Sequence, residues 1–381
     1  MNFSRSSMRR IASHLALLPS GIVSNPLVTL RDGEVVDIGQ WERLDAMEGV
    51  EFYAGMLVPS LVNAHCHIEL SYLEGQVARR GGFAAFASGV ARTRNLFTPE
   101  QREEAVARAD KAMWMEGVGA VGDIANDESA FGVKAQSPIC YRTFAEVFGL
   151  RTASIEALEP MLGHPETSLT PHSTYSLQDE IFKRVCRSGD APLSIHFMES
   201  EGERDLYNGS GALHEWYQTQ GWECDFLHYG SPAERIVASV PADRSVILVH
   251  NCCVTQHDID TIMGHFTAPV YWVVCLGSND YISGVMPDID LLRRNGLNIC
   301  IGTDSLASNE SLSMIAELKW LKGYPLHEVL TWATANGADA LGYGDLLGRL
   351  EVGRRCGLAV IDALDYENMA LTELSTCRRV L

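Results

Sequence analysis

Short apolar runs alternate with helix-like segments along most of this chain. The runs predict eight strands, at residues 56–64, 118–124, 139–147, 168–172, 192–198, 245–250, 269–275 and 297–303. The segments between them have helical patterns: Thr98 can cap a helix that starts at Pro99 and ends before Gly117. Eight strand and helix units match a (β/α)₈ barrel in number and in size. We therefore predict an α/β fold in which residues 56–345 form such a barrel.

The two ends of the chain have a different pattern. Residues 10–55 contain short strand-like runs with a turn at Asp32 and Gly33, and the segment from Gly348 resembles strand, turn and strand. Pairing of these ends predicts a small β-sandwich made of residues 1–55 and 346–381, with the barrel inserted between its halves.

Composition narrows the classes of function. Asp and Glu number 49 against 30 Lys and Arg, which gives a formal net charge of -19. Such a charge repels phosphate backbones, so we expect no nucleic-acid partner. No apolar run approaches the length of a membrane span, so we expect no membrane partner either. The ten cysteines show no CxxC spacing, which argues against a zinc ribbon and against a disulfide scaffold.

The opening segment combines basic residues with a short apolar stretch from Leu15 to Leu18. That stretch is too brief for a secretory signal, and no small-residue cleavage site follows it. The alternation from Ala12 to Leu18 instead predicts a first strand. With the scattered cysteines, this pattern indicates a cytoplasmic protein.

Residues of metal-ligand type stand at the ends of several predicted strands. His65 and His67 end the first barrel strand, and residues two apart on a strand face the same side. His196 ends the fifth strand and Asp304 follows the eighth. Because the C-terminal ends of barrel strands gather at one face, these side chains predict a divalent-metal site with room for water. By themselves, a chance HxH pair and a helix-capping Asp304 stay open as alternatives.

A carboxylate and two further histidines lie at the same predicted face. Glu199 follows His196 by three residues, where it can move a proton between water and substrate; Glu201 and Glu203 are its alternatives.

His250 ends the sixth strand, which suits a group that polarises the attacking water or the substrate. His172 ends the fourth strand, which favours a substrate contact over a metal ligand. Either histidine can instead be a hydrogen-bonded residue of the core.

Taken in order, these segments resemble the amidohydrolase superfamily. The likeness is closest to its branch of mononuclear aminohydrolases, which includes chlorohydrolases and deaminases such as aminodeoxyfutalosine deaminase. The matching segments are LVPSLVNAHCHIELS, TPHSTYS, SIHFMESEGE, VILVHN, CLGSNDYISG and IGTDSLASNESLSM, with LEVGRRCGLAVID near the end.

The resemblance implies a set of four metal ligands. Two-metal barrels of this class carry an anionic bridge at the end of the fourth strand, where this chain has a histidine, so we expect one divalent ion, zinc, with iron as the alternative. The expected ligands are His65, His67, His196 and Asp304.

The resemblance also implies a reaction. Glu199 is expected to carry protons to a ring nitrogen, while His250 and Asp304 orient the attacking water. The expected activity is hydrolytic deamination of an amino-substituted heteroaromatic ring, such as that of a purine nucleoside derivative. Hydrolysis of a cyclic amide or a chlorinated ring stays an alternative, as does a binding protein on an inactive barrel. A homodimer is expected from the family alone.

Substrate contacts are expected near the first strand and the fourth. Glu69 in HCHIELS makes that segment more similar to aminodeoxyfutalosine deaminases than to S-adenosylhomocysteine deaminases. The latter use an acidic residue after the first strand to grip ribose, whereas this loop offers Arg79 and Arg80, which suit a substrate carboxylate. We therefore expect Glu69, Arg80 and His172 to contact substrate, solvated loop charges being the alternative for the arginines.

Overall fold

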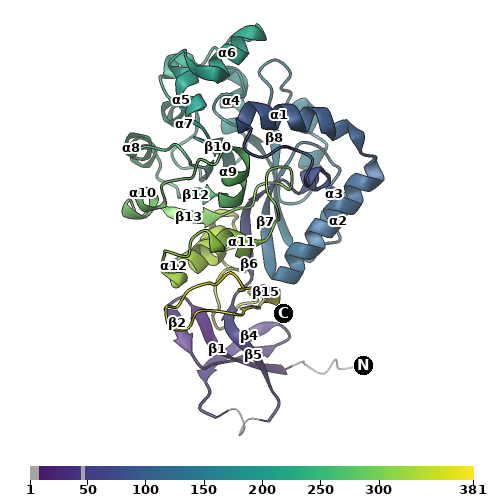
Figure 1. The fold of residues 1–381 in the computed structure, drawn as a ribbon, viewed down its shortest axis with the longest axis vertical. Coiled ribbons are helices and arrows are strands. Elements are labelled where there is room, and N and C mark those ends of the chain that lie inside the picture. The colour runs from purple at the N-terminus through teal and green to yellow at the C-terminus, as the bar shows by residue number, and fades with distance from the viewer. Residues whose placement is uncertain (1–7, 44–47) are drawn as a thin grey trace.

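The computed structural model describes residues 8–43 and 48–381, so residues 1–7 of the opening segment lie outside the described residues. A barrel with its helices makes up most of the molecule, and a small β-unit lies beneath it (Figure 1). β1 (Met8–Leu18) and β15 (Cys377–Arg379) lie at that same lower end. The chain thus leaves the small unit, builds the barrel and returns.

The barrel contains eight parallel strands in two hydrogen-bonded sheets, β6-β7-β8-β9 and β10-β11-β12-β13. Parallel bridges link Ser173 to His196 and Cys66 to Asp304, and these bridges join the two sheets at both seams. The predicted α/β barrel is therefore confirmed. The strands are β6 (Leu61–Cys66), β7 (Val118–Ala125), β8 (Cys140–Val147), β9 (Thr167–Pro171), β10 (Leu193–Phe197), β11 (Val246–His250), β12 (Val270–Val274) and β13 (Asn298–Ile301).

Helices follow the barrel strands and surround them. In α2, the Thr98 side chain accepts from the Gln101 backbone N–H and Pro99 is the first residue, while Gly117 ends the helix at φ 106°, as predicted. None of the described helices has the length and apolar character needed to cross a bilayer. The helices are α1 (Gly82–Thr93), α2 (Pro99–Glu116), α3 (Phe131–Lys134), α4 (Asp179–Cys186), α5 (Glu201–Tyr207), α6 (Gly211–Thr219), α7 (Pro232–Ser239), α8 (Gln256–His265), α9 (Leu276–Ile282), α10 (Ile289–Arg294), α11 (Met314–Lys319), α12 (Leu326–Thr331) and α13 (Gly337–Ala340).

Alternation along each strand divides the barrel's apolar side chains into two sets. On β11, Ile247 and Val249 belong to a cluster inside the barrel, whereas Val246 and Leu248 belong to the larger cluster that packs against the helices. On β10, Ile195 and Phe197 belong to the outer cluster, so His196 between them continues an inner row to the mouth of the barrel.

The two ends of the chain form one small sheet, in the order β15-β14-β5-β1-β3-β4, with β2 on β1. β14 pairs with β5, which confirms the predicted pairing of the chain ends. Asp32 and Gly33 connect β3 to β4 at φ values of 51° and 84°, the left-handed pair that a tight hairpin turn requires. The remaining strands of this sheet are β2 (Gly21–Ser24), β3 (Pro26–Arg31), β4 (Glu34–Gln40), β5 (Val50–Val58) and β14 (Ala359–Ile361).

Two predicted strands are wrong. Residues 56–64 are not one strand: β5 ends at Val58 in the small sheet, and β6 begins at Leu61 in the barrel. Pro59 stands between them and lacks the N–H that a continuous ladder needs. The segment from Gly348 contains no strand before β14, and its outer neighbour β15 lies beyond the predicted pair.

We predict that Gly55→Ala destabilises the seam between β5 and β14. Gly55 has φ 125°, and a Cβ atom there would lie 2.2 Å from the carbonyl oxygen of Ile361. Strain and repulsion together should lower the free energy of unfolding by about 2–4 kcal/mol. Gly132→Ala is the matched control, because its Cβ would meet open space. Equal melting temperatures for the two variants, measured by circular dichroism, would contradict the prediction.

Candidate metal centre

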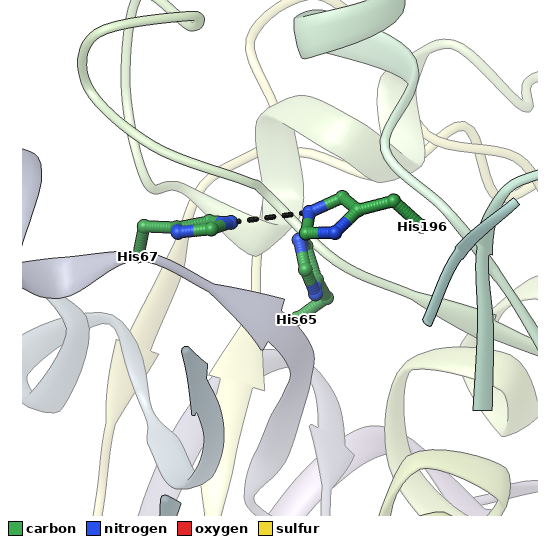
Figure 2. A group of neighbouring side chains, drawn as sticks. All are labelled: His65, His67 and His196. Atoms are coloured by element: carbon green, nitrogen blue, oxygen red, sulfur yellow. Dashed lines mark hydrogen bonds between the residues drawn. The ribbon is translucent and has the colours of Figure 1, made fainter. Parts of the chain in front are cut away.

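Three imidazoles meet at the mouth of the barrel. His65 comes from β6, His67 directly follows β6 and His196 lies on β10, and all three are buried. The Nε2 atoms of His67 and His196 lie 3.3 Å apart, and Figure 2 shows the His65 ring next to this pair. One nitrogen of each ring lies within 4.8 Å of the others. The structure therefore brings together the three histidines predicted as ligands.

A local irregularity in β6 turns both of its histidines inward. The register between β6 and β7 shifts between Asn63 and Cys66, so β6 carries one additional residue there. Cys66 packs in the cluster outside the barrel, while the rings of His65 and His67 share the mouth. Gly302 on the neighbouring strand end leaves the space, since a Cβ there would lie 2.9 Å from the Cβ of His65.

Asp304 presents one carboxylate oxygen to the imidazoles. Its Oδ1 lies 3.7 Å from His65 Nε2 and 3.5 Å from His67 Nε2. Its Oδ2 accepts hydrogen bonds from the hydroxyls of Ser278 at 2.6 Å and Ser308 at 2.7 Å. These two bonds fix the orientation of the carboxylate. The alternative role of Asp304 as a helix cap is wrong, because α11 begins only at Met314 and is capped by Ser313.

The protonation states of these groups suit a cation. Burial lowers the pKa of His65, lowers the pKa of His67 to about 3 and lowers the pKa of His196 well below its usual range, so the three rings are neutral. Burial opposes ionisation of Asp304, but the neighbouring imidazoles outweigh it and hold the pKa of its carboxyl well below the usual range.

Apart from the contact between Nε2 of His67 and Nε2 of His196, the hydrogen bonds of the rings leave their metal-facing nitrogens unused. His196 Nδ1 donates to the carbonyl oxygen of His172 at 2.9 Å, which leaves a lone pair on Nε2. Neither ring nitrogen of His65, nor Nδ1 of His67, has a hydrogen-bond partner among the described residues. Three neutral imidazoles and one carboxylate are a donor set that fits a single divalent ion.

Glu199 lies just beyond β10 and is buried next to the imidazoles. Its Oε1 is 3.9 Å from His250 Nε2, and burial raises the pKa of its carboxyl. Glu203 instead accepts hydrogen bonds from the backbone N–H groups of Met198 and Glu199, at 3.0 and 2.8 Å. Glu201 is exposed. Of the three glutamates, Glu199 has the freest carboxylate at the mouth.

His250 turns toward the mouth through an unusual backbone conformation. Its φ of 79° reverses the alternation after Val249, at a cost of about 1–3 kcal/mol for a residue that is not glycine. Its Nδ1 is 2.9 Å from Asn279 Oδ1, so Nδ1 donates and the Nε2 lone pair faces Glu199. The ring stacks on His196 with centroids 5.4 Å apart.

The three predicted substrate contacts have different surroundings. The half-buried His172 lies beside His196, with ring centroids 4.6 Å apart. The Glu69 carboxylate faces the loop after β7 and orders it, because it accepts from the backbone N–H of Asn126 at 3.1 and 3.0 Å. Glu69 is therefore not free to bind a ligand.

Arg80 and Arg79 lie at the rim of the mouth. Both donate to Asp280 on α9, at 2.6 and 2.9 Å, and the Arg80 side chain is largely exposed. The two guanidiniums are therefore already paired within the chain.

Sequence reasoning missed four polar groups around the imidazoles. Ser278, Ser308 and Asn279 lie in segments that matched the superfamily, but single hydroxyls and amides there gave no chemical signal. Glu146 is different, because it is a carboxylate at the end of a predicted strand and follows the same pattern as His172 and His196. A search for every ionisable residue at the end of a predicted strand would therefore have found Glu146.

We predict that Asp304→Asn weakens metal binding by more than about 100-fold, since even partners behind a ligand contribute 10- to 100-fold. The loss removes the only charged oxygen within 4 Å of His65 and His67 in the described chain. Elemental analysis after dialysis against a chelator provides the measurement. Asp280→Asn, which alters a carboxylate paired at the rim, should retain the metal. Equal metal content in the two variants would remove Asp304 from the ligand set.

Known proteins share this architecture and sequence pattern. The model of the amidohydrolase family matches residues 56–380. Adenosine deaminase of Helicobacter pylori is 26% identical over 86% of this chain and 85% of that protein. Aminodeoxyfutalosine deaminase of Nitratiruptor sp. is 25% identical over 81% of this chain and 79% of that protein. Helicobacter pylori aminofutalosine deaminase, crystallised with methylthio-coformycin, superposes with a TM-score of 0.79 at 26% identity, covering 93% and 92% of the two chains. Since the family model spans most of its length, this chain belongs to the amidohydrolase family.

Proposed function

We propose that this chain is a hydrolytic deaminase that uses one divalent metal and releases ammonia from an amino-substituted purine nucleoside derivative. The observation that carries the proposal is the buried convergence of three neutral imidazoles and Asp304, with Glu199 next to them. The names of the compared proteins support the same chemistry, because all three are deaminases. An aminodeoxyfutalosine-type substrate is the specific form of the proposal that two of these names favour.

The proposed metal ligands are His65, His67, His196 and Asp304. Three nitrogens and one carboxylate oxygen are typical of zinc, which we therefore favour over iron. Bound there, the ion would lower the pKa of a coordinated water toward neutrality and act as a Lewis acid.

Side chains of the protein would transfer the protons and orient the water. Glu199 would take a proton from the attacking water and deliver it to a ring nitrogen, since burial raises the pKa of its carboxyl and so makes the carboxylate a better proton acceptor. His250 would accept a hydrogen bond from the water through Nε2, because its Nδ1 donates to Asn279 Oδ1. The water oxygen bonds to the amino-bearing carbon, and the first water proton stays on the ring nitrogen. The second proton moves from the added hydroxyl to the amino group, whose bond to carbon breaks, so ammonia leaves and a carbonyl remains.

Fewer side chains are available to contact the substrate directly. We propose His172 as a direct contact, because it is half-buried at the mouth beside His196. Arg80 would reach a substrate only by leaving Asp280. Glu69 would act indirectly, through the loop that it orders.

We predict ammonia release from at least one member of a panel of aminopurines and their nucleosides, in an amount equal to the substrate consumed. A coupled ammonia assay with product identification by mass spectrometry provides the measurement. Chlorinated triazines and cyclic amides complete the panel, because they test the two alternative leaving groups. Chloride or a ring-opened acid as the only product would contradict deamination.

We predict that Glu199→Gln retains the metal but loses roughly two to four decades of kcat, the usual contribution of general acid–base catalysis. Glutamine keeps the size of the side chain and removes its ability to carry a proton. Glu201→Gln is the matched control, since Glu201 is exposed on the following helix, and it should keep its activity. Near-normal turnover of Glu199→Gln would show that a group other than Glu199 carries the proton.

A further inference from the structure

A row of polar side chains lies behind the imidazoles, at the ends of β6, β7, β8 and β10. Glu69, after β6, accepts from the backbone N–H of Asn126, after β7. The side-chain amide of Asn126 donates to Glu146 Oε2, on β8, at 2.9 Å. Glu146 Oε1 lies 3.5 Å from Nδ1 of His196, on β10. The row thus ends at a proposed metal ligand.

Glu146 has the burial and the direction of a group that acts on His196. It is only 4% exposed, and its Oε1 has no hydrogen-bond partner among the described residues. Alternation along β8 turns it inward, because Phe144 belongs to the cluster inside the barrel and Ala145 to the cluster outside. An unpaired carboxylate oxygen in such a place is unfavourable unless a neighbouring donor shares a proton with it.

Two other roles fit the same surroundings less well. Atoms of Glu146, His172 and His196 lie within 4.8 Å of one another, as in a second cation site. However, His196 Nδ1 already carries a hydrogen that it donates to the carbonyl oxygen of His172, while Nε2 faces His67. Direct binding of substrate is disfavoured, because Glu146 Oε1 is buried against the His196 ring.

We propose that Glu146 is a positioning residue for the metal, acting through His196. Its carboxylate would share the Nδ1 hydrogen of His196 with the His172 carbonyl, which fixes the tautomer and the ring plane and makes Nε2 a stronger donor to the ion. Asn126 would in turn hold Glu146, and Glu69 would hold Asn126. The inference rests on the metal site of the proposed function, and it holds for any substrate.

The test compares metal binding by variants that keep the size of the side chain. Glu146→Gln should bind Zn²⁺ roughly 10- to 100-fold more weakly in competition with a chromophoric chelator. The visible spectrum of the Co²⁺-substituted protein should shift as well, because the ligand field of His196 changes. Glu203→Gln is the matched control: it alters another buried glutamate, but one whose oxygens bind backbone N–H groups, so its affinity and spectrum should stay as in the wild type.

A second variant keeps the test valid if Glu146→Gln does not fold. Asn126→Ala removes the amide that holds Glu146 and changes only a half-buried side chain. It should weaken Zn²⁺ binding in the same direction but by less.

The outcomes separate this inference from the proposed activity. Wild-type affinity and an unchanged Co²⁺ spectrum in both variants would overturn the role of Glu146. Two equivalents of Zn²⁺ in the wild type, with Glu146→Gln losing only the weaker one, would overturn it in favour of a second cation site. Tight Zn²⁺ binding without ammonia release from any substrate would refute the deaminase proposal and leave the result for Glu146 unaffected.

Discussion

Neutral imidazoles are buried around one carboxylate at the mouth of the barrel, and the need to satisfy these groups determines what the site can bind. His65, His67 and His196 lie in the interior, and neither ring nitrogen of His65 nor Nδ1 of His67 has a hydrogen-bond partner among the described residues. The ionised Asp304 lies beside them. Unpaired polar groups in such a place are costly, and an isolated buried charge costs more. A divalent cation satisfies the nitrogens and the charge together. The barrel makes this arrangement possible because it brings strand ends that are far apart in sequence to one mouth.

Much of this site was predictable from the rule that the C-terminal ends of barrel strands gather at one face. The placement of Cys66 outside, with a histidine on each side of it facing inward, follows a period of two residues from His65 to His67, although the irregularity in β6 before Cys66 sets its phase. The order of His196 and Asp304 around the barrel follows from their places at the end of the fifth strand and after the eighth. Local signals predicted the Asp32–Gly33 turn and the start and end of α2. The homodimer and the cytoplasmic location stay predictions.

The rest depended on partners that no local pattern reveals. Asn279, on α9, fixes the tautomer of His250, and no local pattern indicates the left-handed φ of His250. Glu69 looked free in the sequence, yet the loop after β7 uses its carboxylate, and Arg80 is similarly paired with Asp280. The break at Pro59 was hidden because apolar residues continue on both sides of it, although they belong to two different sheets.

Anomalous X-ray diffraction at the zinc edge, on crystals of the protein loaded with Zn²⁺, would locate the ion relative to its proposed ligands. We expect one strong peak, at about 2.0–2.1 Å from a nitrogen of each of His65, His67 and His196 and at about 2.0–2.2 Å from Asp304 Oδ1. A peak elsewhere, two peaks of similar height at the mouth, or no peak in fully loaded protein would contradict a single metal centre built from these four side chains.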